Sequence, residues 1–169
     1  MSFHLSKGAN NKTLSDPVYS SLTRLDLGVS ALVPRGWTVT GDEARLRVIG
    51  PATGGSSPTF TLVQGEPEEP GEAWYEAFCR QAMDQLIAGG AELLRVDTFV
   101  LSSFVAVTAV YYRGSTPERA VSQLQAYLWA DSTRMLVADA ATARAREEAD
   151  FPVFDHILRS LRLLPPRTA

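Results

Sequence analysis

The sequence has few of the residues on which most enzyme chemistry depends. Among its 169 residues there is one cysteine, Cys79, and there are two histidines, His4 and His156. A single cysteine excludes an intrachain disulfide and a multi-cysteine metal site. Two histidines offer little material for general acid–base catalysis, and no G-x-S-x-G nucleophile motif is present. We therefore expect no catalytic centre, no metal site and no cofactor.

These three residues have ordinary structural interpretations. Cys79 falls within a predicted helix that has no histidine on the same face to activate a thiol, so we expect a small buried hydrophobe. His4 lies in a segment without periodicity. His156 lies on the last predicted helix, where we expect a partly exposed surface histidine.

Charge of either sign is not concentrated in any part of the chain. Sixteen basic and 19 acidic residues give a formal net charge of −3, and no basic cluster is present. A nucleic-acid partner is therefore not expected, and the arginines near the C-terminus suit the end of a helix. The acidic clusters at residues 66–69 and 147–150 lack the spacing of a calcium loop, so we interpret them as solvated charge. A pair of carboxylates from separate strands, as glycosidases use, stays an open alternative.

Long apolar runs are also missing. The longest uncharged apolar stretch, residues 99–112, is too short and too rich in β-branched residues to span a bilayer, and the first 20 residues have no apolar run of signal-peptide length. We expect a cytosolic protein that does not insert into membranes, provided that residue 1 is the natural start.

The composition itself is that of an ordinary globular domain. Hydrophobic residues make up 45% of the chain and charged residues 21%, and a chain of this length buries a substantial core without disulfides. The patterns divide it into a mobile arm at residues 1–20, a single domain at residues 21–164 and a tail at residues 165–169.

Alternation of apolar residues predicts several strands in the first part of the domain. One is at residues 25–33, and short strands at 37–39 and 44–50 follow. Residues 50–58 are rich in glycine and proline, but a strand at 59–64 follows them instead of a helix, so they suit a hairpin loop better than a phosphate-binding loop. The residues expected on one face of the first strand are Leu25, Leu27, Val29, Ala31 and Val33.

Two amphipathic helices and a set of four strands complete the domain. The first helix is predicted at residues 70–88, with Gly89 and Gly90 at its end. In the closing helix we expect Asp150 to be the N-cap and Pro152 to lie in the first turn. The four strands, expected to form an antiparallel meander, cover residues 91–101, 103–114, 119–131 and 134–140. The sequence therefore predicts an α+β fold, with an antiparallel sheet of six to seven strands and two helices.

One strand face is a candidate binding surface. Strand alternation puts Leu124, Ala126 and Leu128 on one face of residues 119–131 and a set of aromatic and amide side chains on the other. If the helices cover the leucine face, the second face stays open for an apolar peptide or a second subunit. The alternative is that Tyr127 and Trp129 pack under the closing helix. The candidate residues are Tyr112, Gln123, Gln125, Tyr127 and Trp129.

Three local motifs occur in an informative order. A VP-x-GW turn at residues 33–37, a G-P loop at 50–51 and an F-x-x-I-L-x-S-L helix at 154–161 flank a long helix and a meander. This order resembles the PsbP-like superfamily over about residues 25–164. Its members include the photosystem II protein PsbP, a yeast Ran-binding release factor, DcrB- and LpqN-type proteins and Eag chaperones.

The resemblance implies an α/β/α sandwich and non-enzymatic work, as an adaptor, chaperone or accessory protein that binds another polypeptide. The lipoprotein members carry a lipobox cysteine, whereas Cys79 is internal, which counts against a membrane-anchored role. No functional residue is transferred from these relatives, because they bind different partners through different surfaces.

Two hypotheses of function follow. The first is a protein-binding module, in which the Tyr127 and Trp129 face takes an apolar segment of another polypeptide or of a second copy. The second is a small-molecule binder or a hydrolase, with a pocket between the sheet and the first helix that Trp74 or Trp37 lines.

Overall fold

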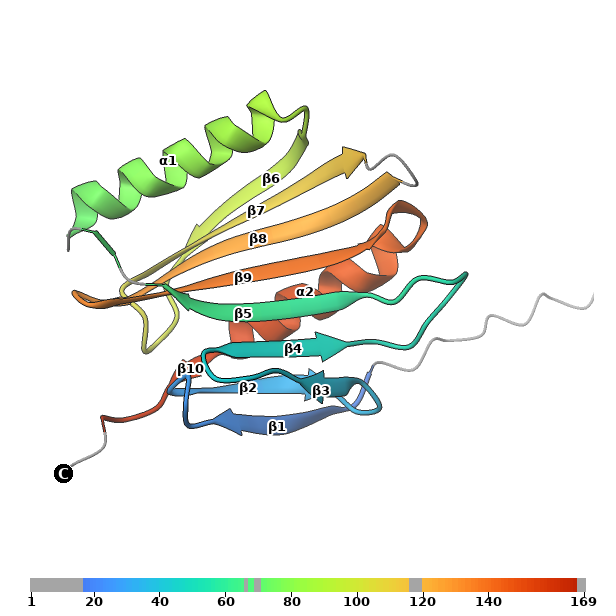
Figure 1. The fold of residues 1–169 in the computed structure, drawn as a ribbon, viewed down its shortest axis with the longest axis horizontal. Coiled ribbons are helices and arrows are strands. Elements are labelled where there is room, and N and C mark those ends of the chain that lie inside the picture. The colour runs from blue at the N-terminus through green and yellow to red at the C-terminus, as the bar shows by residue number, and fades with distance from the viewer. Residues whose placement is uncertain (1–16, 66, 69–70, 116–119, 167–169) are drawn as a thin grey trace, which may run out of the picture.

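A computed structural model describes residues 17–65, 67–68, 71–115 and 120–166 as a three-layered α+β fold. Two helices, α1 (Glu72–Ala88) and α2 (Glu147–Ser160), lie on opposite faces of a large antiparallel sheet (Figure 1). A 3-10 turn, η1 (Arg144–Arg146), leads into α2. The predicted fold class is therefore confirmed.

The large sheet has seven strands in the order β3-β4-β5-β9-β8-β7-β6, and every neighbouring pair is antiparallel. The predicted meander is the consecutive run from β6 to β9. The strands are β3 (Thr38–Thr40), β4 (Arg45–Ile49), β5 (Thr59–Gly65), β6 (Glu92–Phe99), β7 (Ala106–Ser115), β8 (Ala120–Asp131) and β9 (Arg134–Ala143).

A second, smaller sheet was only partly predicted. It contains β1 (Tyr19–Arg24), β2 (Val29–Pro34) and β10 (Arg162–Leu163), in the order β1-β2-β10. β1 begins inside the segment expected to be a mobile arm, and residues 1–16 of that arm, with His4, lie outside the described residues. β10 follows α2 directly, so a strand and not the helix is the last element of the fold.

The path of the chain explains the position of α1. β5 lies in the middle of the large sheet, whereas the next strand, β6, forms its far edge. The chain therefore has to cross β9, β8 and β7, and α1 makes this crossing (Figure 1). Gly90 lies between α1 and β6 and has a φ of 88°, a left-handed backbone conformation that residues other than glycine rarely adopt.

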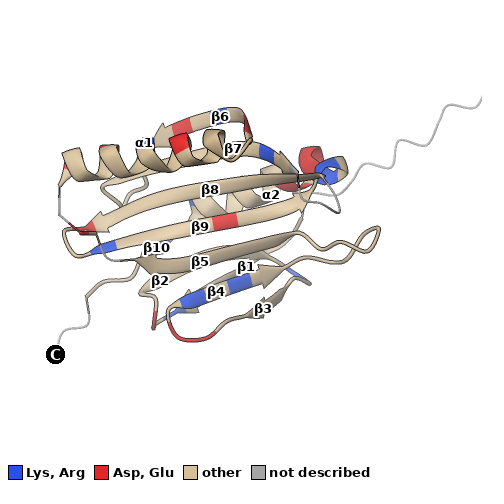
Figure 2. Cartoon of the chain, turned by 45° about the horizontal axis from the view of Figure 1, so that its top comes forward, with Lys and Arg blue, Asp and Glu red and all other residues tan. Residues whose placement is uncertain are grey.

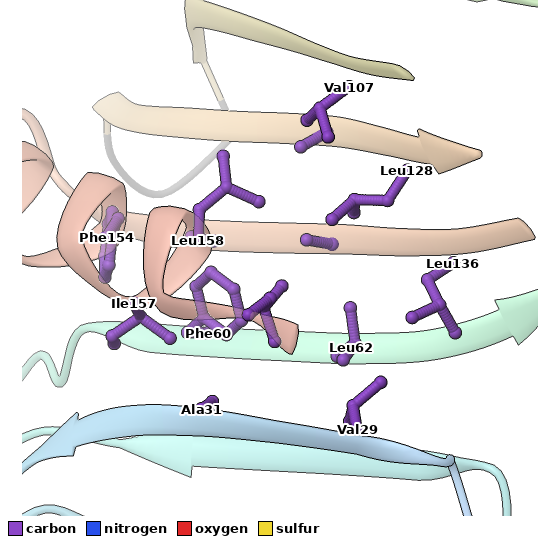
Figure 3. Packing of buried hydrophobic residues seen from close by; sticks show 14 of the residues in the cluster. Val29, Ala31, Phe60, Leu62, Val107, Leu128, Leu136, Phe154, Ile157 and Leu158 are labelled. Carbon is purple, nitrogen blue, oxygen red and sulfur yellow. The ribbon is translucent and has the colours of Figure 1, made fainter. Parts of the chain in front are cut away.

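The main hydrophobic core lies between the large sheet, the small sheet and α2. Figure 3 shows Phe154, Ile157 and Leu158 of α2 directed at the sheet, together with buried side chains of β2, β5 and β8. Small residues such as Ala126 and Ala138 let the α2 backbone approach the strands closely. The central strands are therefore covered by a layer of buried apolar side chains on this side.

Three local predictions differ from the structure. Asp150 is not the N-cap of α2, because the helix begins earlier, at Glu147. Asp150 is instead buried in the helix, where it pairs with Arg146 and accepts a hydrogen bond from Thr142. Pro152 consequently lies beyond the first turn, inside the helix. Leu25 lies in the β1–β2 turn and is 63% exposed, so it does not join the buried face of the strand.

Candidate functional site

The aromatic and amide face of β8 is not open along its whole width. The leucine face packs under α2, but α1 lies over the other face, so the premise that both helices cover the leucine face is wrong. Tyr112 and Tyr127 are 6% and 2% exposed and belong to the cluster beneath α1. The alternative of packing under the closing helix is also wrong, because α2 lies on the opposite face.

Tyr75 attaches α1 to the sheet. Its hydroxyl donates a hydrogen bond to the backbone oxygen of Tyr127 at 2.7 Å and also bonds the Thr108 hydroxyl at 3.0 Å. Its ring stacks on Trp129, with 5.6 Å between ring centroids. Burial is the main cause that raises the pKa of Tyr75, so its hydroxyl remains a donor at neutral pH. Tyr75 therefore joins α1 to both β7 and β8.

A short chain of hydrogen bonds leads from beneath α1 to the uncovered part of the face. The Tyr127 hydroxyl donates to Gln125 Oε1 at 2.5 Å, and Gln125 Nε2 donates to Asp139 Oδ1 at 3.0 Å. Desolvation by the surrounding sheet raises the pKa of Asp139, and the bond from Gln125 opposes this effect. These two contacts, one at each polar atom, fix the orientation of the Gln125 amide.

A groove of about 760 Å³ runs between α1 and strands β8 and β9. We call it the amide groove, because Gln81, Gln85 and Gln125 line it together with apolar side chains. Its apolar lining includes Trp74, Phe78, Leu86, Tyr127, Met135 and Val137.

Aromatic rings order the wall and floor of the amide groove. Phe78 stacks on Trp74, with 5.2 Å between their centroids, and meets Tyr127 edge-on at 5.3 Å. Trp74 and Val137 stay partly exposed. The groove thus offers apolar area and amide hydrogen-bonding groups side by side.

A second groove, of about 660 Å³, lies on the other side of α1, against β6 and β7. Trp129, Cys79 and Thr108 line it, and Val96 on the edge strand β6 is 44% exposed there. Burial raises the pKa of the Cys79 thiol, which agrees with the expected small buried hydrophobe. A reactive thiolate would need the opposite shift.

The five predicted site residues are thus divided by α1. Gln125 and Tyr127 line the amide groove, and Trp129 lines the second groove, with its indole nitrogen donating to the Asp131 backbone oxygen at 3.0 Å. Tyr112 is buried beneath α1, and burial raises its pKa to about 12. Gln123 is half-buried further along β8 and lines neither groove.

Some lining residues come from α1 itself and were not among the five candidate residues of the sheet face, although the second hypothesis expected Trp74 or Trp37 to line a pocket beside this helix. Trp74 lines the amide groove, whereas Trp37 packs edge-on against Phe154 in the main core. The signal in the sequence was the aromatic pair Trp74 and Phe78, spaced by one helical turn. Whether this pair lines a groove or lies in a core depends on which strands α1 crosses.

Charge is sparse on the sheet surface next to the amide groove. Figure 2 shows that β5 and most of β8 carry no charged residue, while Arg45 and Arg47 lie on β4. Asp139 is the acidic residue of β9. A partner segment on this surface would therefore meet mostly neutral groups.

Within the described residues no helix is long and apolar enough to cross a membrane.

His156 is exposed, as predicted, and stacks on Tyr19. Among the described residues no group of three histidine, cysteine, aspartate or glutamate side chains is placed to hold a metal ion.

Comparison with known proteins identifies the fold. No family model matches the chain, and no curated protein matches it in sequence. LpqN of Mycobacterium tuberculosis, described as involved in cell envelope biogenesis, is similar with a TM-score of 0.68 and 13% identity, over 89% of this chain and 93% of LpqN.

Two further solved structures are similar. Cyanobacterial PsbP (CyanoP) of Synechocystis sp. PCC 6803 has a TM-score of 0.61 and 14% identity, over 94% of this chain and 98% of its own. PA94 of Pseudomonas aeruginosa is a protein of unknown function described as a putative regulator. It has a TM-score of 0.60 and 14% identity, over 89% of this chain and 99% of its own. The expected PsbP-like fold is therefore confirmed. The fold does not distinguish between cell compartments, so the cytosolic location stays a prediction.

Proposed function

We propose that this PsbP-like chain is a non-enzymatic polypeptide-binding protein, an adaptor or chaperone, and that the amide groove takes an apolar segment of its partner. The observation that carries the proposal is the lining of the groove. Trp74 and Phe78 from α1 meet Gln125 and Tyr127 from β8 in one place. Apolar rings offer contact area to side chains, and fixed amides offer hydrogen bonds to a backbone.

The neutral surroundings support the same class of partner. A groove for nucleic acid or for a charged metabolite would place cations along its wall. Among the described residues, the lining of the amide groove includes one charged residue, Glu68, and no arginine or lysine. An apolar, weakly charged polypeptide segment suits this lining.

A displayed peptide library tests the proposal without a known partner. The library is selected on the wild-type chain, and the selected peptides are measured by fluorescence anisotropy against two variants. Val137→Glu places a carboxylate in the groove and is expected to weaken binding by about tenfold or more, because the charge loses water without gaining a partner. Val39→Glu is the matched control and should bind like the wild type. Val39 is a partly exposed valine of β3, the edge strand at the other end of the large sheet from β6.

Equal binding of the selected peptides by both variants would contradict the groove assignment. If no peptide is selected at all, polypeptide binding itself is contradicted. Circular dichroism of each variant checks that the fold is retained.

The source of the segment is a separate question. Size exclusion with light scattering over a tenfold concentration range measures self-association of the wild type. A dimer that Val137→Glu dissociates would make a second copy the partner. A monomer at every concentration would make the partner another polypeptide.

A small apolar molecule in the same groove is the alternative, and the volume of about 760 Å³ favours it, since such ligands occupy sites of this size. Hydrolysis has less support, because burial raises the pKa of the Cys79 thiol, whereas a nucleophile needs a lowered pKa.

A further inference from the structure

A separate cavity opens at the end of the sandwich, away from both sides of α1. It has a volume of about 1110 Å³ and lies where the β1–β2 turn, the β8–β9 turn and the segment after β10 meet. Leu25, Leu163 and Leu164 form apolar walls, with Pro165 and Pro166 beside them. Arg134, at the start of β9, also lines it.

Arg134 differs from the other partly buried arginines that the structure describes. Arg24, Arg113 and Arg146 have side chains that are 18%, 32% and 31% exposed, and each forms a two-point pair with a carboxylate. In the Arg113–Glu147 pair the two hydrogen bonds measure 2.8 and 2.7 Å, and in the Arg146–Asp150 pair 3.0 and 2.9 Å. The two-point pair is the geometry that a guanidinium fork favours.

The Arg134 side chain is only 22% exposed but has no such pair. Its NH1 donates one long hydrogen bond, 3.4 Å, to the Leu27 backbone oxygen, and its buried Nε atom has no hydrogen-bond partner among the described residues. A desolvated cation with open donors is costly. Because the Nε atom is buried, the end of the guanidinium, with NH1 and NH2, is the part that can meet an anion in the cavity.

Asp131 does not fill this role. Its carboxylate is 3.9 Å from the Arg134 Nε atom and half exposed to water. Asp131 Oδ1 accepts hydrogen bonds from the Thr133 backbone nitrogen and hydroxyl, both at 2.9 Å. Asp131 therefore organises the β8–β9 turn and leaves the guanidinium without a close partner.

The backbone leaves room for the guanidinium in this position. Gly28 has a φ of 65°, and a Cβ atom added there would lie 2.6 Å from Arg134 NH1. Glycine thus serves two purposes, the left-handed turn conformation and the space that Arg134 occupies.

We propose that this end cavity binds an apolar molecule that carries a single carboxylate, with the carboxylate on Arg134 and the apolar part against Leu25, Leu163 and Leu164. The two terminal nitrogens of one guanidinium suit a two-point pair with one carboxylate, and the long Asp131 contact leaves them without a carboxylate of their own. The leucine and proline walls match an aliphatic or aromatic body. The site is distinct from the amide groove and does not depend on the function proposed for it.

Calorimetric titration with octanoate and with octanamide tests the proposal on the unaltered chain. The two probes share their apolar part and differ in charge. Octanoate is expected to bind at least about tenfold more tightly, because charge-assisted bonds to arginine are stronger than neutral ones. Arg134→Gln should remove this preference, whereas Arg47→Gln, on the exposed part of β4, should retain it.

Amide shifts in NMR spectra locate the bound probe. Changes at Gly28, Arg134 and Leu163 support the cavity, whereas changes confined to α1 and β8 overturn it. Equal affinity for the two probes, or no binding of octanoate at millimolar concentration, also overturns it. If Arg134→Gln fails to fold, the two probes and their shifts on the wild type decide alone.

Discussion

The two faces of the large sheet are covered in different ways. On one face, α2 buries Phe154, Ile157 and Leu158 completely, and small alanines let its backbone come close to the strands. On the other face, α1 buries only Tyr75 and Cys79 along its 17 residues, and grooves remain on both its sides. The first arrangement gives stability, and the second leaves the grooves on which the proposed function depends.

The side chains at the two contacts differ. Four alanines, Ala31, Ala126, Ala138 and Ala140, belong to the main core that α2 covers. Tyr112, Tyr127 and Trp129 face α1, which itself carries Trp74 and Phe78, so bulky rings meet bulky rings. These rings line the two grooves beside α1.

The largest expected effect compares a phenylalanine from each helix. Phe154→Ala should lower the free energy of unfolding by about 3–5 kcal/mol, because Phe154 is fully buried in the main core. Phe78→Ala should cost only about 1–2 kcal/mol, because Phe78 is partly exposed beside the amide groove. Chemical denaturation measures both. Equal losses would contradict the unequal packing of the two faces.

A smaller effect is expected where α1 is attached. Tyr75→Phe removes the hydroxyl that bonds the Tyr127 backbone oxygen and Thr108, and should cost about 1–2 kcal/mol. Tyr112→Phe is the matched control, since the Tyr112 hydroxyl has no hydrogen-bond partner among the described residues. Urea denaturation curves measure the two losses. A Tyr75→Phe variant as stable as the control would show that the attachment contributes nothing.

Acid should reduce the stability contributed by the α2 side more than that contributed by the α1 side. Hydrogen bonds from Arg113 hold the pKa of Glu147 at about 2, against an ordinary value of 4.5. Because the folded pKa is the lower one, this contribution is complete above about pH 4.5 and is lost as the pH falls towards 2. Water screens the pair, so the effect should be well below that of Phe154→Ala.

The thermal midpoint measured between pH 5 and 2 checks this contribution. The fall in midpoint should be shallower in Glu147→Gln than in the wild type. Identical slopes would mean that the Arg113 pair does not contribute to folding.

The smallest effect is expected on the α1 side, at Asp139. Its folded pKa is raised, mainly by desolvation, so its ionised form opposes folding once the pH exceeds the ordinary value of 3.8. Asp139→Asn should therefore raise the thermal midpoint slightly at pH 7 and leave it unchanged near pH 3. Calorimetric scans at both values check the sign. A lowered midpoint at pH 7 would mean that the carboxylate stabilises this face.

The sequence predicted most elements because their patterns are local. The periodicity of residues 70–88 and the alternation of β8 need no knowledge of distant neighbours, and both match the structure. β1 and β10 lack this local signal. They exist because each pairs with β2, which is a long-range condition.

The candidate site was predicted only in part, for a related reason. Alternation correctly put Gln125, Tyr127 and Trp129 on one face of β8. It could not show that α1 crosses that face, since this follows from the strand order, in which β9 separates β5 from β8. The unpaired fork of Arg134 was equally invisible, because only the fold shows that Asp131 stays 3.9 Å away.

Native-state hydrogen exchange tests the central claim most directly, because it measures how firmly each helix is held. We expect the amides of α1 to exchange through openings of clearly lower free energy than those of α2, whose slowest amides should require global unfolding. Peptide bound in the amide groove should then slow exchange in α1 and leave α2 unchanged. Equal protection of α1 and α2 in the free protein would contradict the claim that one face is built for stability and the other for binding.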